Sequence, residues 1–405
     1  VDEALANSAE IADRCNASLP GIERQLPVFI PSESPYIEKS QRDLSPDQIF
    51  LSLVEDGITE KYGEDAAEGV WDRAEQEISV FLEGGLEHYF LQTWDFIQFC
   101  DEKGIERGPG RGSAAGAIVS YALGITDVDP LEYDLIFERF YNPGRAKGFP
   151  DIDNDFPTLD RPKIKKYMEE RWGIERVSQI GTVRRFKPLS AVNGLHTVCG
   201  IGFSEANELK QIIKTVPDIE ILGPDSVGWS EEKDPGKTVY VMEHVGKEVE
   251  KWVKKQEDTK RAETFIDLVG SICSRVEGYG LHPSGVVVSK VDLEDELPLM
   301  WNASQNMLAT MFPMNDVDAR GFVKQDVLGL ANLDILQGWK ALVKDTLGEI
   351  DWNEAKEYVE SEPDHPMWKL YDEGLTLGLF QIEDGYARRL CKELKPRSIE
   401  DLGII

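Results

Sequence analysis

The sequence predicts a mixed α/β fold that is mostly helical, with a small β-sheet assembled from distant parts of the chain. Short β-type runs occur around residues 151–153, 285–289 and 321–328. A long stretch of mainly helical pattern separates the first run from the other two. The chain has 405 residues, which is more than one ordinary hydrophobic core needs, so we expect about two to four domains.

The N-terminal third of the chain is predicted to be mainly helical. Residues 1–20 have a helical pattern that ends at a Pro-Gly pair, and residues 21–45 are rich in Pro and Ser and extended. From residue 45 to residue 98 the apolar spacing is helical. One apolar face predicts a core-facing helix and consists of Leu86, Tyr89, Phe90, Trp94 and Ile97. Residues 113–123, rich in Ala and Gly, indicate a further helix that ends at Gly124.

The middle and the end of the chain alternate between helices and loops. From residue 160 the pattern is one of basic helices, the first opened by Arg161 and Pro162. Residues 217–240 have the composition of a loop, after which helices resume and end before Gly278. The two later β-type runs follow, and residues 331–405 are helical with breaks at one glycine and two prolines. The sheet is therefore expected to be discontinuous in sequence.

The composition argues against several classes of protein. The charged content is 29% and the hydrophobic content 41%, as in soluble globular proteins, and no run approaches the roughly eighteen apolar residues of a membrane span. Five widely spaced cysteines without a C-x-x-C pair disfavour a zinc ribbon or a disulfide framework, and no signal-peptide pattern is present. We therefore expect a cytoplasmic protein. The net charge of −31 predicts weak and salt-sensitive affinity for DNA.

Paired carboxylates are the most informative feature of the sequence. Asp151 and Asp153 are two residues apart in one β-type run, and Lys324 and Asp326 are two apart in another. Residues two apart in a strand point to the same face, so pairing of the two strands would bring three carboxylates and one ammonium together. Such a patch could hold two divalent cations about 3.5–4 Å apart. An EF-hand loop is excluded, because its sixth and twelfth positions would be Phe and Pro.

A glycine-rich turn at residues 108–113 (GPGRGS) precedes the small-residue helix. Such a turn exposes backbone N–H groups and a helix N-terminus to an anion. Arg111, beside Gly112 and Ser113, adds a guanidinium group that is suited to phosphate. A Rossmann fingerprint of the form G-x-G-x-x-A and a plain structural turn are the alternatives.

Three further side chains are candidates for a functional site. Arg139 and Arg145 flank a short segment just before the first aspartates, and arginine is suited to triphosphate oxygens. The alternative is a surface ion pair, for which Glu138 would be the partner. His282 lacks a partner carboxylate in the sequence, and we expect a hydrogen-bonded core histidine.

Several long motifs, in the same order and spacing, resemble the palm of bacterial DNA polymerase III alpha subunits, the C-family of replicative DNA polymerases. The motifs are residues 108–116 (GPGRGSAAG), 121–130 (YALGITDVDP), 137–143 (FERFYNP), 150–156 (PDIDNDF) and 322–330 (FVKQDVLGL). Residues 379–402 resemble the start of that family's fingers. A fragment of a bacterial enzyme and a bacteriophage relative both fit.

The resemblance implies a nucleotidyltransferase palm of the polymerase-beta type, with an inserted helical thumb and a partial helical fingers domain. The palm would consist of residues 19–182 and 279–330, and the thumb of residues 183–278. Residues 331–405 would be the start of the fingers. Residues 1–18 would be the end of a truncated PHP domain or a linker.

The resemblance also implies an activity, the template-directed addition of deoxynucleotides to a primer 3′-hydroxyl with two Mg²⁺ ions. The residues that match the metal-binding catalytic aspartates of the family are Asp151, Asp153 and Asp326. Those that match its nucleotide-binding residues are Arg111, Gly112, Ser113, Arg139, Arg145 and Lys324. The basic residues at the start of the thumb, where duplex DNA would bind, are Arg184, Arg185 and Lys187.

The partners implied by the resemblance are primer-template DNA and deoxynucleoside triphosphates. A sliding clamp and other replisome subunits would bind through segments that this sequence does not contain, and no membrane is implied. The alternative is a catalytically incomplete palm and thumb that serves only as a DNA- or replisome-binding module. A Rossmann-type oxidoreductase is a further alternative.

Overall fold

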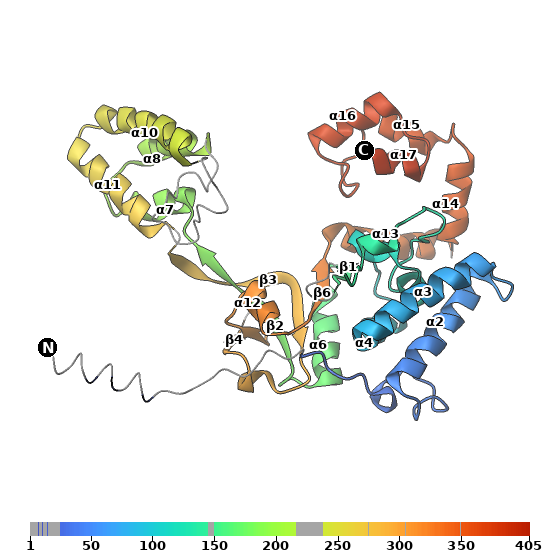
Figure 1. Ribbon diagram of the computed structural model, residues 1–405. Coiled ribbons are helices and arrows are strands. Elements are labelled where there is room, and N and C mark those ends of the chain that lie inside the picture. Colours follow the sequence, from blue (N-terminus) through green and yellow to red (C-terminus); the bar gives the residue numbers. More distant parts are fainter. Residues whose placement is uncertain are drawn as a thin grey trace. The chain divides into compact units, whose positions relative to one another are not determined.

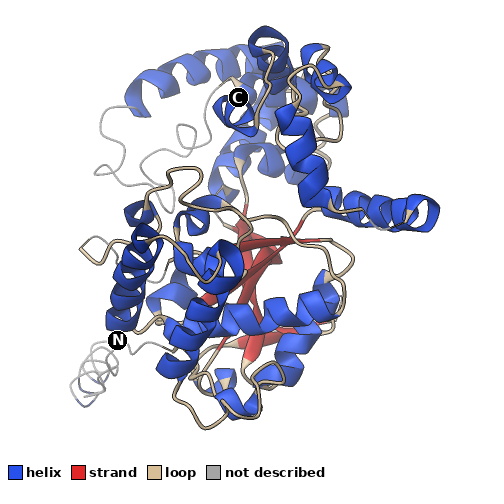
Figure 2. Ribbon diagram, turned by 90° about the vertical axis from the view of Figure 1, so that its right-hand side faces the viewer, coloured by secondary structure: helices blue, strands red, loops and turns tan. Residues whose placement is uncertain are grey.

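The computed structural model is a predominantly helical chain with one six-stranded mixed sheet (Figures 1 and 2). It describes residues 7, 10, 14, 25–144, 150–215, 238–273, 275–303, 305–348 and 350–405. Most of the helix predicted over residues 1–20, and most of the loop predicted over residues 217–240, lie outside the described residues. The prediction of a mixed, mostly helical α/β fold is confirmed.

The chain divides into two compact units. The first unit contains Val1–Gln179, Pro283–Leu308 and Asn315–Ile405. The second contains Ile180–His282 and Ala309–Met314. Each unit therefore combines segments that are distant in the sequence, as the predicted discontinuity of the sheet requires.

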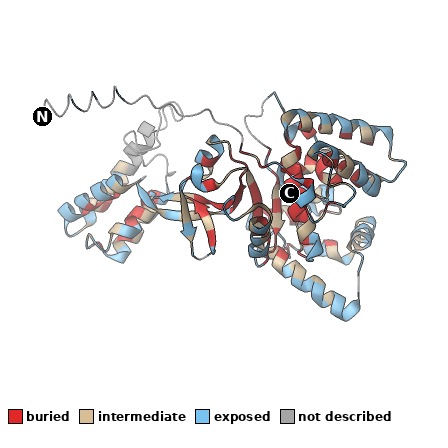
Figure 3. Cartoon of the chain, turned by 90° about the horizontal axis from the view of Figure 1, so that it is seen from below, coloured by how far each residue is buried: buried red, intermediate tan, exposed pale blue. Residues whose placement is uncertain are grey.

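Three helices follow one another where helical spacing was predicted: α2 (Pro46–Tyr62), α3 (Glu68–Gly84) and α4 (Glu87–Glu102). A short 3₁₀ helix, η1 (Pro31–Glu33), precedes them. Ser45 caps α2 by accepting the backbone N–H of residue 48, which satisfies one of the free donors of the first turn. All five residues of the predicted apolar face, four in α4 and Leu86 at its N-cap, are buried in the core. Figure 3 draws the buried residues of the chain in red.

The continuous helix predicted over residues 113–123 is not present. The segment forms a 3₁₀ helix, η2 (Gly112–Gly116), and a separate short helix, α5 (Ile118–Ala122). Ala117 between them is extended, with φ −107° and ψ 125°. The neighbouring backbone explains the break, because a Cβ at Gly116 would lie 3.1 Å from a carbonyl oxygen that precedes η3 (Phe137–Arg139). Close packing of the two turns therefore overrides the helix propensity of the alanines.

The sheet has the strand order β1-β6-β3-β2-β5-β4. Strands β1 and β6 form a parallel pair in which Asp153 lies opposite Asp326. Strands β3 and β6 form an antiparallel pair in which Gly285 lies opposite Asp326 on its other side. The strands are β1 (Asp153–Phe156), β2 (Val177–Arg185), β3 (Val276–Val288), β4 (Leu299–Asn302), β5 (Met307–Thr310) and β6 (Lys324–Gly329). The predicted pairing of the two acidic strands is thus confirmed, whereas β2, β4 and β5 were not predicted.

Helix α6 (Arg161–Trp172) begins with Pro at its first turn, as predicted, because proline at that position removes no helical hydrogen bond. The Arg161 side chain anchors this end to the sheet by donating from Nε to the carbonyl oxygen of Val327 at 2.8 Å. Two short elements complete this part of the chain, η4 (Leu293–Asp295) and α12 (Met314–Ala319).

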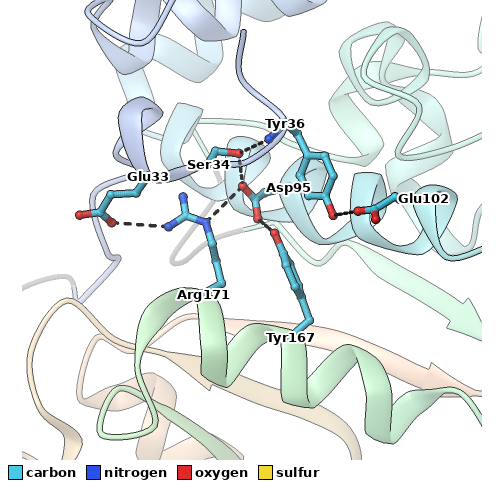
Figure 4. Close-up of polar contacts among 7 residues, drawn as sticks. All are labelled: Glu33, Ser34, Tyr36, Asp95, Glu102, Tyr167 and Arg171. Atoms are coloured by element: carbon cyan, nitrogen blue, oxygen red, sulfur yellow. Dashed lines mark hydrogen bonds and ion pairs between the residues drawn. The ribbon is translucent and has the colours of Figure 1, made fainter. Parts of the chain in front are cut away.

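A buried aspartate joins three segments of the first unit (Figure 4). Asp95 on α4 accepts hydrogen bonds from the Ser34 hydroxyl and the Tyr167 hydroxyl, both at 2.5 Å. Arg171 Nε lies 3.3 Å from the same carboxylate and compensates its charge. The extended segment before α2 is therefore attached to both α4 and α6 through one carboxylate, whose hydrogen bonds offset the cost of burial.

The second unit has a hydrophobic core of its own, in which Trp252 and Phe265 are the largest side chains. Trp252 Nε1 donates to the carbonyl oxygen of Glu205, so the indole is buried without losing its hydrogen bond. The helices of this unit are α7 (Pro188–Leu195), α8 (Phe203–Lys214), α10 (Thr238–Lys255) and α11 (Thr259–Ile272).

The C-terminal segment is helical, as predicted. Its helices are α13 (Ala331–Leu347), α14 (Trp352–Ser361), α15 (Pro366–Asp372), α16 (Gly385–Leu394) and α17 (Ile399–Ile404). The predicted break at Gly348 has φ +88°, a conformation that favours glycine. Trp368, Tyr371 and Cys391 form a small separate core. Within the described part of the chain, no helix has the length and apolar character needed to cross a membrane.

Candidate active site

The pairing of β1 with β6 brings the predicted acidic residues together. Asp153 lies directly opposite Asp326 across the two strands. Lys324 Nζ lies 2.9 Å from Asp326 Oδ2 and 3.4 Å from Asp151 Oδ1. The convergence of three carboxylates and one ammonium that the sequence predicted is therefore present, although Asp151 lies just before the strand rather than within it.

The carboxylates of this cluster differ in their environments. Asp326 is only 2% exposed, whereas the Asp151 side chain is 66% exposed. Burial raises the pKa of Asp153, and the charges of Asp326 and Asp151 raise it further, against opposition from Lys324 and Arg111. Burial alone would lower the pKa of Lys324, but its hydrogen bonds and the charges of the two aspartates raise it overall. The cluster thus has an excess of negative charge that favours a cation.

The residue types of the cluster suit a hard divalent cation, because carboxylate oxygens are the ligands that Mg²⁺ prefers. The side chains do not form a ready metal site: among the described residues no group of three or more His, Cys, Asp or Glu side chains is arranged to hold an ion. The ammonium group of Lys324 lies against two of the carboxylates, where it compensates part of their charge.

The glycine-rich turn lies beside the carboxylates. Arg111 and Asp153 form an isolated antiparallel bridge, so the backbone of the turn follows the start of β1. Gly112 has φ +63°, and a Cβ at this position would lie 3.5 Å from Asp153 Oδ2. Ser113 is exposed in η2. The predicted α-helical N-terminus is absent here, because α5 begins only at Ile118.

Arg111 has a partner that the sequence did not predict. Its Nη1 lies 3.4 Å from Asp155 Oδ1, and the backbone of Gly108 donates to the carbonyl oxygen of Asp155 at 2.9 Å. Asp155 is therefore a support of the glycine-rich turn. Its own pKa is raised by burial, which the nearby guanidinium opposes.

The remaining predicted residues are less closely grouped. Arg139 is exposed in η3, and Arg145 lies outside the described residues. The three basic residues predicted to bind DNA belong to the second unit and are all exposed. Two of them lie in strand β2, so this part of the predicted basic helical region is wrong, and the third caps α7. His282 is half-buried.

Two residues of the site were missed by the sequence analysis. Ser284 Oγ donates to Asp326 Oδ1 at 2.7 Å, and both groups are buried. The Tyr89 hydroxyl accepts from the backbone N–H of Ile152 and donates to the carbonyl oxygen of Lys324, each at 3.4 Å. Tyr89 was predicted only as a core residue. No local pattern distinguishes such supporting hydroxyls, because their partners come from distant strands.

Carboxylates on adjacent strands, next to a glycine-rich turn, are the features expected of a domain that handles nucleotide phosphates. The family model for the bacterial DNA polymerase III alpha NTPase domain matches residues 48–329, and the model for the bacterial DNA polymerase III alpha subunit finger domain matches residues 332–405. The chain belongs to the bacterial DNA polymerase III alpha family.

Curated relatives support the same family. The DNA polymerase III subunit alpha of Halalkalibacterium halodurans is 32% identical over 410 residues, which are 99% of this chain and 33% of the relative. That of Bacillus subtilis is 31% identical over 405 residues, with 99% and 33% covered. That of Thermus aquaticus is 34% identical over 341 residues, with 83% and 26% covered. The chain thus spans about a quarter to a third of the length of these relatives.

Proposed function

We propose that the protein is a DNA-directed DNA polymerase that adds deoxynucleotides to a primer 3′-hydroxyl during replication. Membership of the DNA polymerase III alpha family supports this proposal. The observation that carries it is the direct opposition of Asp153 and Asp326, with Lys324 against the cluster and the glycine-rich turn beside it. Residues that are distant in the sequence are thereby arranged around one patch suited to cations and phosphates.

The three carboxylates of Asp151, Asp153 and Asp326 would hold two Mg²⁺ ions. When bound, such ions supply positive charge to the reacting phosphate and to the attacking hydroxyl. The Ser284 hydroxyl keeps the Asp326 carboxylate in one orientation. The ammonium of Lys324 is available to phosphate oxygens once other cations compensate the carboxylates.

The glycine-rich turn would bind the incoming triphosphate. Backbone N–H groups at Gly112 and Ser113 suit an anion without adding a bulky side chain. Arg111, which contacts Asp155 in the structure, would contribute its guanidinium to the phosphates. Arg139 and Arg145 would add positive charge for the triphosphate.

The two units suggest how the domains are divided. We assign residues 19–182 and 279–330 to the palm, residues 183–278, which make up most of the second unit, to the thumb, and residues 331–405 to the start of the fingers. The thumb would contact the DNA backbone through Arg184, Arg185 and Lys187. A sliding clamp and other replisome subunits are the expected partners of the full-length gene product.

The experiment that tests the function is primer extension with Mg²⁺ by the full-length gene product and its variants. Asp153→Asn and Asp326→Asn are expected to lower the rate of incorporation by roughly a hundredfold or more, because each removes a carboxylate charge from the proposed cation site. Asp292→Asn, which changes a surface aspartate paired with Arg176, is the control and should retain the activity of the wild type. Near wild-type extension by either site variant would refute the assignment.

The same assay distinguishes the alternative of a binding module. In that case the wild-type protein would bind primer-template DNA, but no nucleotide would be incorporated at any concentration of Mg²⁺. Incorporation that disappears in Asp326→Asn, while DNA binding persists, would establish the enzymatic function.

A further inference from the structure

A buried ion pair on α3 lies next to the two turns that carry the proposed nucleotide-binding residues. Arg73 Nε and Glu77 Oε1 are 2.6 Å apart, one helical turn from each other. The Glu77 side chain is fully buried, and that of Arg73 is 20% exposed. A buried ion pair seldom adds net stability compared with apolar residues of similar size. The other contacts of this pair therefore indicate what role it has.

The first set of contacts reaches the segment that follows the glycine-rich turn. Glu77 Oε2 accepts the backbone N–H of Val119 at 3.1 Å, at the start of α5. Arg73 Nη2 donates to the carbonyl oxygen of Gly116 at 2.8 Å, at the end of η2. The pair therefore satisfies one donor and one acceptor of the backbone where η2 gives way to α5.

The second set of contacts reaches the segment that carries Arg139. Arg73 Nη2 also donates to the carbonyl oxygen of Leu135 at 3.2 Å, and its guanidinium lies 5.9 Å from the centre of the Phe137 ring. One guanidinium group thus contacts the backbone on both sides of the junction between the two turns. The guanidinium, which is planar and rigid, therefore bridges the end of η2 and the segment that precedes η3.

The backbone leaves little tolerance at this junction. A Cβ at Gly116 would lie 3.1 Å from the carbonyl oxygen of Ile136. The two turns therefore approach closely, and a shift of one displaces the other. Residues 112 and 113 lie at one end of η2, and Arg139 lies at the end of η3.

We propose that Arg73 and Glu77 are positioning residues for the incoming nucleotide. They do not contact the nucleotide; they hold the turn that carries Gly112 and Ser113 at a fixed distance from the turn that carries Arg139. This inference rests on the proposed function, since it assigns both turns to one triphosphate site. Loosening the pair should weaken nucleotide binding more than it slows the chemical step. The contacts of the pair lie at the far end of η2 and before η3, whereas the pairing of β1 with β6 and the bridge between Arg111 and Asp153 hold the carboxylates.

The test is steady-state primer extension by the full-length gene product carrying Arg73→Met together with Glu77→Leu. Apolar side chains of similar size keep the helix packed but cannot form hydrogen bonds with the backbone of Gly116, Val119 and Leu135. We expect the KM for deoxynucleotides to rise about tenfold and kcat to stay within about twofold of wild type, since a misplaced turn costs binding energy. The affinity for primer-template DNA should not change.

The matched control is Asp95→Asn, which weakens a different buried carboxylate cluster of the first unit, shown in Figure 4. It should lower the thermal unfolding temperature without changing the KM for deoxynucleotides. A KM equal to wild type in the Arg73/Glu77 variant, or an equal increase in the Asp95 variant, would overturn the proposal. If the double variant does not fold, Arg73→Lys, which keeps the charge but loses the fork, gives the same comparison.

Failure of this inference and failure of the proposed function have different signatures. If Asp326→Asn retains full activity, the catalytic assignment itself is wrong, whatever the Arg73 variants do. If Asp326→Asn is inactive and the Arg73/Glu77 variant has the KM of the wild type, only the positioning role is wrong.

Discussion

Both oxygens of the Asp326 carboxylate have partners within the protein. Oδ1 accepts the Ser284 hydroxyl at 2.7 Å, and Oδ2 lies 2.9 Å from the ammonium of Lys324. The side chain is 2% exposed, so its orientation depends on these two contacts rather than on water. An incoming cation would compete with Lys324 and leave the Ser284 contact intact. Ser284 is therefore the residue that keeps the buried carboxylate directed toward the cluster.

Replacement of Ser284 by Ala should weaken the site without unfolding the protein. A hydrogen bond to a charged group contributes about 1.5–3 kcal/mol, so we expect activity to fall roughly tenfold to a hundredfold. The concentration of Mg²⁺ needed for half-maximal activity should rise at the same time. Ser289→Ala, which changes another buried serine, is the control and should leave the Mg²⁺ requirement unchanged. Primer extension measured at a series of Mg²⁺ concentrations gives both the maximal activity and the concentration needed for half of it.

Lys165 on α6 gives a prediction about pH. Burial lowers the pKa of Lys165 to about 8 from its ordinary 10.5, and repulsion from Arg161 adds to this. Between these two values the unfolded chain binds more protons than the folded one, so the free energy of unfolding should rise as pH increases from about 8 to 10. Below this range both states are protonated, and the cost of the buried ammonium is fully present.

Urea unfolding of the wild type and of Lys165→Met at several pH values measures this effect. The rise between about pH 8 and pH 10 should be smaller in the variant, which has no ammonium to lose. The variant should also be the more stable protein near pH 7. An identical pH dependence in both proteins would show that Lys165 titrates normally.

At the scale of the elements, sequence patterns predicted what is determined locally. The helices between residues 45 and 98 follow their apolar spacing, and β1 and β6 follow the alternation of their charged residues. Strand β2 was missed because it has a glycine in its interior, at Gly181, which weakens a local strand pattern. The glycine has a tertiary reason, since its N–H donates to the Thr310 hydroxyl at 2.9 Å and its Cα lies against the Thr310 carbonyl.

Local sequence patterns also failed to predict the contacts that support the candidate active site. The convergence of the carboxylates could be predicted from period-two spacing, but the Asp155 partner of Arg111 could not. Neither could the contacts of the ion pair on α3 with the backbone of the Ala-rich segment at Gly116 and Val119. These contacts join residues that are more than forty positions apart, and no local propensity encodes them.

Gly181→Ala should destabilise the second unit. A Cβ at this position would lie 2.0 Å from the Thr310 carbonyl oxygen, and backbone has little freedom to move away. We expect a loss of about 1–3 kcal/mol in the free energy of unfolding. Gly270→Ala, in helix α11 of the same unit, has open space around its Cβ and should be neutral or stabilising by up to about 1 kcal/mol. Denaturant unfolding of the two variants compares them directly, and equal effects would contradict the packing argument.

At the scale of the whole molecule, charge is unevenly distributed. The net charge is −31, yet residues 156–217 are net basic and residues 1–100 strongly acidic. A polyanion such as DNA is repelled by the average charge and attracted by local basic surfaces. The proposed DNA contacts in the second unit must therefore account for much of the affinity, and binding should depend steeply on salt.

Removal of three proposed phosphate contacts should reduce this salt dependence. The substitutions are Arg184→Ala, Arg185→Ala and Lys187→Ala. With one counterion released per contact, the slope of log affinity against log salt should decrease in magnitude by about three. Fluorescence anisotropy with labelled primer-template DNA at several salt concentrations measures the slope.

The control for this prediction is a triple alanine variant of Lys251, Lys254 and Lys255 on α10. These lysines are exposed and paired with glutamates, and we assign them no contact with DNA. An equal decrease in slope in both variants would show that net charge, rather than a local contact surface, controls binding.

The parallel pairing of Asp153 with Asp326 has a consequence for biosynthesis, because 173 residues separate the two partners. A ribosome that adds about 5–20 residues per second needs roughly ten to thirty seconds to extend the nascent chain from one to the other. Throughout that interval β1 lacks β6, the strand with which it forms hydrogen bonds. The backbone N–H and C=O groups along this side of β1 therefore stay unpaired in the nascent chain. Helices α2 to α4 can fold before then, but the acidic patch cannot form until β6 has left the exit tunnel.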